Sequence, residues 1–423
     1  MTATTVPGVS GVDSGFWTRQ RKTGVVLVAL GLIAAVVFGL LATSKAARFA
    51  VGETTSGFAL SIPGTLGAVL FGVLAIAAGA VLAATGRRFG LWTALSLAAF
   101  VASFLCWQVS QAPGTLNTLA LGNLAKGSLE LSLPLVLGAL GGVLCERSGV
   151  VNVAIEGQFI AGAFAAAMFG TIAGSIWAGI IAASIGGLLI SALLAVLAIR
   201  YLVDQVILGI VLNVFALSLT AFLYEQFMQK NQDAFNKPPR VPQWDIPVLG
   251  DIPIIGPTLF KANIFVYVAL ALVVAIHFGL FKTRWGLRTR AVGEHPTAAD
   301  TLGVKVLGLR YRNVLLAGLV AGIGGATFTL LATTNFNKGM TSGLGFIALA
   351  ALIFGRWNPV GAFLAALFFG FANQLAFSIS ALNSPIPTQF LSMLPYVATI
   401  VAVAGLVGRV RAPAADGKPY VYG

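Results

Sequence analysis

Long apolar runs, separated by polar connections, are the feature that most constrains how this chain can fold. Hydrophobic residues make up 58% of its 423 residues and charged residues only 9%, whereas soluble domains carry roughly 25% charged residues. Such runs lie at about residues 24–43, 62–85, 91–110, 122–145, 150–171, 174–198, 206–224, 262–281, 313–332, 343–356, 358–379 and 389–407. Because about 20 apolar residues cross a ~30 Å hydrocarbon core as one helix, we predict an all-α, polytopic integral membrane protein with about 12 transmembrane helices (11–12).

The run at 343–356 is shorter than the others and is followed at once by the polar turn Arg356-Trp357-Asn358-Pro359. It either spans the membrane or is re-entrant, returning to the side from which it came. If it is re-entrant, every later run crosses in the opposite direction.

Charge placement predicts which connections are cytoplasmic. The segment from Lys282 to Arg312 has seven basic and two acidic residues, and such an excess marks a cytoplasmic loop because positive charges resist translocation. The Pro-rich connection 225–261 has four of each and is predicted to lie outside. Twelve spans then place both termini in the cytoplasm, together with 18 of the 26 Lys and Arg residues. Since these residues lie at the ends of apolar runs, the net charge of +13 does not imply a nucleic-acid partner.

A short helix is predicted inside the basic loop. Pro296 suits the first helical position, where its missing N–H costs nothing, and Gly303 can close the end. So short a helix is not stable alone, which suggests that something else holds it. The alternative is a charged connector that only sets the topology.

The residues indicate no enzyme. The only histidines are His277, in an apolar run, and His295, in the basic loop. They form no metal-ligand cluster and, with Cys106 and Cys145, no nucleophile–base arrangement. The phosphate-binding motif G-x-x-x-x-G-K-[ST] is also absent from the sequence. The chain is therefore predicted to have no catalytic residues and to bind no metal or cofactor, so any ATPase must be another chain.

Polar residues within apolar runs are candidates for function because their burial in lipid is costly. Glu156 lies near the start of such a run. It is expected either to lock the structure, by pairing with Arg147 or by accepting bonds from backbone amides near the helix start, or to act directly in transport. Four amides either face a polar pathway or bond a neighbouring helix: Asn152, Gln158, Asn213 and Asn373.

The predicted outer segment around Asn335, Phe336 and Asn337 combines amides with an aromatic ring. This combination suits a cargo that has a ring and hydroxyl groups. The alternative is an ordinary loop.

Several stretches together resemble a known family. They are ERSGVVNVAIEGQFIAGAF (146–164), VDQVILGIVLN (203–213), RAVGEHPTAADTLGVKVLGLRYRNVLLAGLVAGIGGA (290–326), NKGMTSGLGFIALAALIFGRWNPVGAFLAALFFGF (337–371) and PTQFLSMLPYVATIVAVAG (387–405). They resemble permease subunits of ABC importers in the group of branched-chain amino acid and ribose permeases. The closest resemblance is to nucleoside-uptake permeases that work with basic-membrane-lipoprotein-type binding proteins.

The resemblance implies a permease core at 122–408 in a prokaryotic cytoplasmic membrane. Residues 1–121, with about three extra spans, would be an N-terminal extension, and 409–423 a cytoplasmic tail. The implied partners are an ABC ATPase subunit carrying ATP and Mg, a second permease subunit and an extracytoplasmic substrate-binding lipoprotein. Because nucleoside systems of this family commonly use two different permease chains, a heterodimer is expected, and a homodimer is the alternative.

In this family a cytoplasmic coupling helix docks on the ATPase. The resemblance assigns that role here to the short helix of the basic loop, with the residues Gly293, Glu294, His295, Pro296, Ala299, Asp300 and Gly303. The implied mechanism is alternating access driven by ATP. A sugar or a branched-chain amino acid is the alternative cargo, and an ion-coupled secondary transporter is the alternative class.

Overall fold

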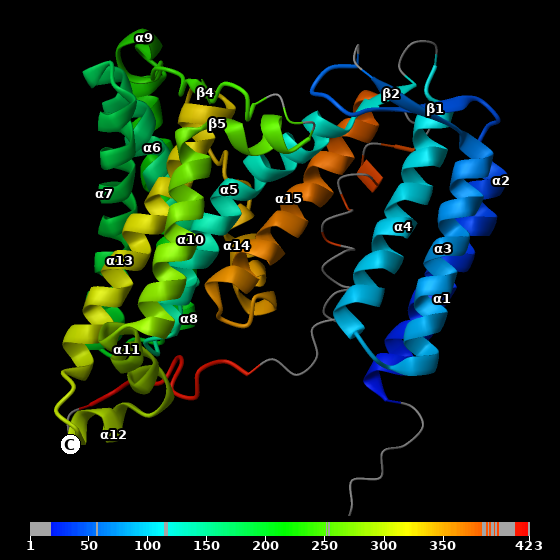
Figure 1. Cartoon of the computed structure of the whole chain (residues 1–423). Helices are drawn as coiled ribbons and strands as arrows, with labels where there is room; N and C mark the ends of the chain where they lie inside the picture. Colours follow the sequence, from blue (N-terminus) through cyan, green and yellow to red (C-terminus); the bar gives the residue numbers. More distant parts are fainter. Residues whose placement is uncertain are drawn as a thin grey trace, which may run out of the picture. The chain divides into compact units, whose positions relative to one another are not determined.

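The computed structural model in Figure 1 describes residues 18–421 except 56–57, 114–116, 251, 253, 383–385, 388, 391–392, 394–395 and 397–410. The α-helices are α1 (Arg19–Ile33), α2 (Gly39–Leu41), α3 (Gly64–Thr85), α4 (Phe89–Gln111), α5 (Leu121–Glu146), α6 (Ile155–Ala173), α7 (Ile176–Ala195), α8 (Gln205–Leu223), α9 (Gln232–Phe235), α10 (Ile264–Lys282), α11 (Arg284–Glu294), α12 (Pro296–Thr301), α13 (Val306–Thr327), α14 (Leu344–Phe354) and α15 (Pro359–Ala381). Turns of π-helix are η1 (Ala34–Phe38), η3 (Val196–Arg200), η4 (Tyr224–Met228), η5 (Gly256–Phe260) and η6 (Phe328–Ala332). The strands β1 (Ala46–Ala50), β2 (Ala59–Pro63), β3 (Thr118–Ala120), β4 (Gln243–Asp245) and β5 (Lys261–Asn263) form two small sheets with the orders β2-β1-β3 and β4-β5.

Within the described residues, ten helical segments are long and apolar enough to cross a membrane. They are Arg19–Leu41, Gly64–Thr85, Phe89–Gln111, Leu121–Glu146, Ile155–Ala173, Ile176–Arg200, Gln205–Met228, Ile264–Lys282, Val306–Ala332 and Pro359–Ala381. Each coincides with a predicted run, so the prediction of a polytopic helical membrane protein is confirmed. The last predicted run, 389–407, lies largely outside the described residues, and the cytoplasmic N-terminus stays a prediction.

The chain forms two compact units. The smaller comprises Met1–Ala50, Thr55–Leu119 and Ile379–Pro387, and the larger comprises Val51–Thr54, Ala120–Ser378 and Thr388–Gly423. The described tail residues 411–421 thus belong to the larger unit. Whether the permease core begins at 122, as the sequence suggests, stays a prediction.

In the smaller unit, α1 and α3 pack through small residues. A Cβ added at Gly24 would lie 2.4 Å from the backbone nitrogen of Ala83, and one at Gly72 would lie 2.5 Å from that of Ala35. Small side chains allow such close approach where no hydrophobic effect drives helices together in lipid.

In the larger unit, α5 and α13 form the centre, and both are mostly buried. Helix α13 packs closely against α7 through glycines, because a Cβ at Gly187 would lie 2.3 Å from the carbonyl oxygen of Gly318. On the α6 side, a Cβ at Gly162 would lie 2.5 Å from the oxygen of Gly322. These contacts fix α13, which rises from the basic loop.

Helix α14 completes a membrane crossing that it is too short to make alone. Its 11 residues reach about 16 Å at 1.5 Å per residue, which is roughly half of a 30 Å hydrocarbon core. The non-helical segment 333–343, after α13, provides the rest of the path. Figure 1 shows α14 beside the lower part of α5, with α15 rising from its end.

Contacts at both ends of this path decide between the two predicted topologies. At one end, the side-chain amide of Asn236, from the connection 225–261 that is predicted to lie outside, binds the backbone of Phe336. At the other end, Nε of Arg147, directly after α5, donates to the carbonyl of Trp357 at 2.8 Å. The chain therefore returns to the end from which α13 started, and the re-entrant alternative for 343–356 is wrong.

We expect Gly322→Val to lower the yield of folded protein, because its Cβ would lie 2.2 Å from the carbonyl oxygen of Ala183. Overpacking costs about 1–3 kcal/mol, and more where backbone must move. The fraction of detergent-solubilised protein that elutes as a single sharp peak measures this. Gly308→Ala is the control on the same helix, since nothing lies within 4 Å of the added atom. Equal yields would contradict the packing described here.

Candidate functional site

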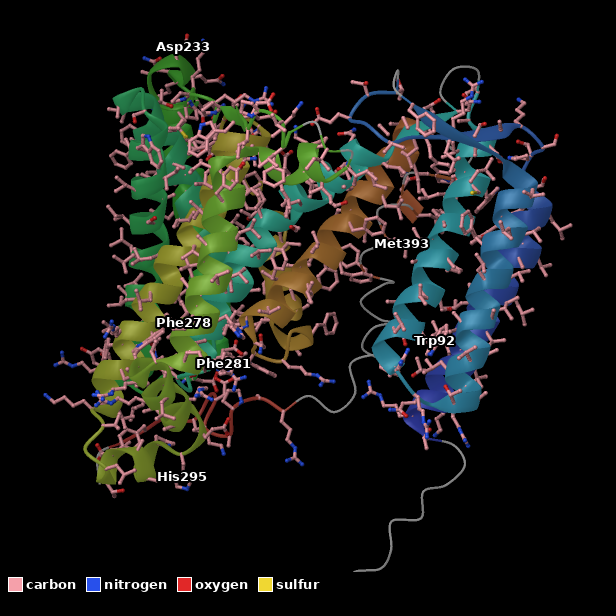
Figure 2. All side chains as sticks on the ribbon, in the orientation of Figure 1. Trp92, Asp233, Phe278, Phe281, His295 and Met393 are labelled. Atoms are coloured by element: carbon pink, nitrogen blue, oxygen red, sulfur yellow. The ribbon has the colours of Figure 1, made fainter. Side chains whose placement is uncertain are left out.

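The basic loop folds into two short helices, α11 and α12, at one end of the larger unit. As the sequence predicts, α12 begins at Pro296, and Gly303 follows it with φ of +80°. The ring nitrogen Nδ1 of His295 lies 3.4 Å from the backbone nitrogen of Ala298 and caps the helix start. Figure 2 shows His295 at the extreme end of this loop.

The two faces of α12 differ in exposure. Ala299 is buried in a small apolar cluster with Val292, Val306 and Tyr420. Leu302, which directly follows the helix, is 84% exposed. Leu302 is thus a large apolar side chain that faces away from its own chain, outside the membrane-spanning segments.

Among the predicted coupling residues, the structure separates inward from outward positions. Gly293 and Ala299 are buried, Pro296 and Asp300 are half-buried, and Glu294, His295 and Gly303 are exposed. The carboxylate of Glu294 accepts a hydrogen bond from the backbone of Ala414 at 3.2 Å. A larger side chain at position 299 would therefore push α12 away from its own chain. Leu302 faces outward, and the sequence analysis did not single it out.

Glu156, in the first turn of α6, binds the start of α14. Its carboxylate accepts hydrogen bonds from the backbone N–H groups of Gly343 (2.8 Å) and Gly345 (2.6 Å) and from the hydroxyl of Thr341 (2.6 Å). The N-terminus of a helix attracts negative charge. The expected structural lock on backbone amides thus exists, but the amides belong to another helix.

Arg147 is not the partner of Glu156. Its guanidinium donates to the carbonyls of Trp357 at 2.8 Å and Arg356 at 3.4 Å, and it lies 5.9 Å from the ring centre of Phe281. Arg147 therefore fixes the turn after α14.

Three of the predicted polar residues bind protein groups within the core. The amides of Asn152 and Gln158 exchange two hydrogen bonds at 3.2 Å each, and Gln158 also donates to Ser191 of α7 at 2.8 Å. Asn213 of α8 accepts from the backbone of Gly157 at 2.8 Å and donates to the carbonyl of Val153 at 2.9 Å. These contacts join α6 to α7 and α8.

The structure places the other predicted pathway residues differently. Phe336 is fully buried and packs edge-on against Phe164 at 5.4 Å, so it belongs to the core. Asn335 accepts a hydrogen bond from Asn337, and Asn337 is exposed. The side chain of Asn373 donates to the carbonyl of Phe369 on its own helix at 3.1 Å. Asn337 is the residue of this group that stays open to a cargo.

A buried polar cluster that sequence reasoning missed lies where α5 ends. Glu146, read as part of a loop, is 3% exposed, and its carboxyl group is hydrogen-bonded to that of Asp416. Burial raises the pKa of Asp416 to about 7. Arg310 of α13, only 2% exposed, faces the same cluster. No pattern in the sequence brings the tail to α5.

In the described part of the chain, no three His, Cys, Asp or Glu side chains are placed to hold a metal ion. The fold provides a bundle of membrane-spanning helices and a half-helix, α14, which spans about half of the membrane and is held at both ends. It also exposes the short helix α12 beyond the end of the bundle. This arrangement is that of a membrane transport subunit.

The family comparison agrees. Residues 124–404 match the family model described as branched-chain amino acid transport system / permease component. The chain belongs to this family and is a permease subunit of an ABC transporter, a multi-pass protein of the cytoplasmic membrane. Membership in this family excludes the alternative class named in the sequence analysis, an ion-coupled secondary transporter.

Curated relatives match over nearly their whole length. The guanosine ABC transporter permease protein NupQ of Bacillus subtilis is 42% identical over 71% of this chain and 97% of its own. The nucleoside ABC transporter permease protein NupC of Lactococcus lactis is 40% identical over 72% and 98%. A second Bacillus subtilis protein, the guanosine permease NupP, is 27% identical over 67% and 83%. No solved structure matches the chain significantly.

We expect Glu156→Gln to lower the thermal stability and the folded yield more than it changes cargo preference. A glutamine keeps one acceptor oxygen but turns an NH₂ group toward donors, and a lost charge-assisted bond costs about 1.5–3 kcal/mol. The unfolding midpoint in detergent measures this. Glu225→Gln is the matched control, because the ion pair of Glu225 with Lys338 is solvent-exposed and such pairs contribute little. Normal stability with altered cargo selectivity would instead give Glu156 a direct transport role.

Proposed function

We propose that this chain is a nucleoside importer's permease subunit. The observation that carries the proposal is the similarity, at 42% and 40% identity, to two permeases named for guanosine and nucleosides over 97–98% of their length. A sugar or a branched-chain amino acid stays the alternative cargo, because a binding protein outside the membrane can dominate selectivity.

The proposed complex has further chains. ATP and Mg bind a separate ATPase subunit, and this chain itself binds no cofactor. An extracytoplasmic lipoprotein delivers the cargo. A second, different permease subunit completes the transmembrane part; in support, the similar chains NupQ and NupP are two distinct guanosine permease proteins of one organism.

In the proposed mechanism, α12 is the coupling helix. ATP binding closes the ATPase subunits, which carry α12 with them, and the transmembrane pathway changes the side to which it opens. The exposed side chain of Leu302 supports docking at this place, since its burial against a partner would remove apolar surface from water. The buried face around Ala299 passes the motion to α13.

We expect Leu302→Ser to weaken association with the ATPase subunit by about tenfold, because full burial of a leucine side chain is worth about 1.5–3 kcal/mol and about 1.4 kcal/mol corresponds to a factor of ten. The measurement is the amount of ATPase that co-purifies with the detergent-solubilised permease over a range of protein concentrations. Leu287→Ser on α11 is the matched control, since Leu287 is also exposed but lies outside the proposed coupling residues. Unchanged association of the Leu302 variant would count against α12 as the docking helix.

The cargo is tested by uptake of labelled guanosine in cells with and without this gene, under ATP depletion and separately under an uncoupler. We expect gene-dependent uptake that stops with ATP depletion and continues when only the ion gradient is collapsed. Unlabelled glucose and leucine serve as competitors. Competition by either, with no effect of unlabelled nucleosides, would move the cargo to a sugar or an amino acid.

A further inference from the structure

The C-terminal segment 411–421 packs against the proposed coupling region. The backbone nitrogen of Ala415 donates to the carbonyl of Gly293 at 2.9 Å. The backbone nitrogen of Ala414 donates to the carboxylate of Glu294 at 3.2 Å. The tail is thereby tied to the junction of α11 and α12.

Tyr420 covers the inner face of the same region. It is buried in the apolar cluster with Val292 of α11, Ala299 of α12 and Val306 of α13. The tail therefore contacts α11, α12 and α13 together, and α12 cannot shift without disturbing it.

Arg310 fastens the tail to the bundle. Its Nη1 donates to the carbonyl of Lys418 at 3.0 Å, and its Nε donates to the carbonyl of Ser148 at 3.2 Å. Ser148 lies in the turn between α5 and α6. One buried guanidinium thus binds both the tail and this turn.

The carboxyl groups of Asp416 and Glu146 lie within hydrogen-bonding reach of each other, and a hydrogen bond between two carboxyl groups requires a proton on one of them. Glu146 is the more deeply buried partner, and Arg310 attracts the charge of Asp416. Burial thus disfavours charge on Glu146 and Arg310 favours it on Asp416, so a donor at position 146 and an acceptor at position 416 suit this pair.

The carboxyl oxygen Oε2 of Glu146 contacts the segment that follows α14. It accepts a hydrogen bond from the indole Nε1 of Trp357 at 2.6 Å, and Trp357 lies three residues beyond the end of α14. Glu146 is thus bound on one side by the tail and on the other by the segment that ends the half-helix.

We propose that residues 411–421 are a coupling strap, in which Asp416 and Glu146 are positioning residues that link movement of α12 to α14. The inference rests on the proposed function, in which α12 docks on the ATPase. A tail that only covers buried polar groups would affect folding alone, whereas a strap affects how much cargo moves for each ATP hydrolysed.

The test uses the complete transporter, with its ATPase, second permease and binding protein, reconstituted in vesicles. Labelled guanosine uptake and ATP hydrolysis are measured in the same vesicles, and their ratio is the coupling ratio. We expect Asp416→Ala to lower this ratio about fivefold or more, with ATPase association unchanged.

Two variants serve as controls. Lys418→Ala is expected to keep the ratio, because the backbone carbonyl of Lys418, not its exposed side chain, binds Arg310. Glu146→Gln is also expected to keep it, since a glutamine can donate to Asp416 and accept from Trp357. Glu146→Ala, which does neither, is expected to lower it.

A normal coupling ratio in both Asp416→Ala and Glu146→Ala overturns the strap. If Asp416→Ala does not fold, Glu146→Ala, which removes the same hydrogen bond from the other side, carries the test. Loss of the ratio in Glu146→Gln as well as in Glu146→Ala would also overturn it, because the hydrogen bonds would not be the cause. Failure of the proposed function is distinguishable, since the unaltered complex would then show no ATP-dependent guanosine uptake.

Discussion

A helix that begins inside a bilayer leaves backbone N–H groups that neither water nor its own turns can satisfy. Helix α14 begins in this way, and the carboxylate of Glu156 accepts the bonds of two of these groups. The preceding segment can leave the helical conformation because Asn236 binds both the N–H and the carbonyl of Phe336. The irregular path of 333–343, and the crossing direction of every span after it, depend on these few hydrogen bonds.

The polar side chains of the core have two separate tasks. Gln158 and Asn213 join α6 to its neighbours inside the bundle, where a hydrogen bond substitutes for the hydrophobic force that lipid removes. Glu146 and Arg310 gather at the end of the bundle with Asp416 of the tail. The first group holds the helices of the bundle in a fixed arrangement. The second group connects the bundle to the basic loop 282–312.

The elements that the sequence predicted correctly are those that depend on residues close to one another in the chain. Run length predicted the spans, and Pro296 with Gly303 predicted α12. The partner of Glu156 could not be predicted, because the amides at residues 343 and 345 meet it only through tertiary packing. Glu146 falls between the predicted runs 122–145 and 150–171, and its burial depends on the tail. The aromatic ring of Phe336 suggested a cargo contact, but the rings of Phe164 and Tyr224 pack against it in the core.

The stretch from Glu146 to Glu156 grips both ends of α14, with Glu146 and Arg147 at Trp357 and Glu156 at Gly343 and Gly345. Both ends of α14 are therefore held by contacts with the same short stretch of chain. One residue added to or removed from α14 would change its length by about 1.5 Å and rotate its ends by about 100° relative to each other. Both sets of contacts could then not form at once, so the contacts at its two ends constrain the length of α14.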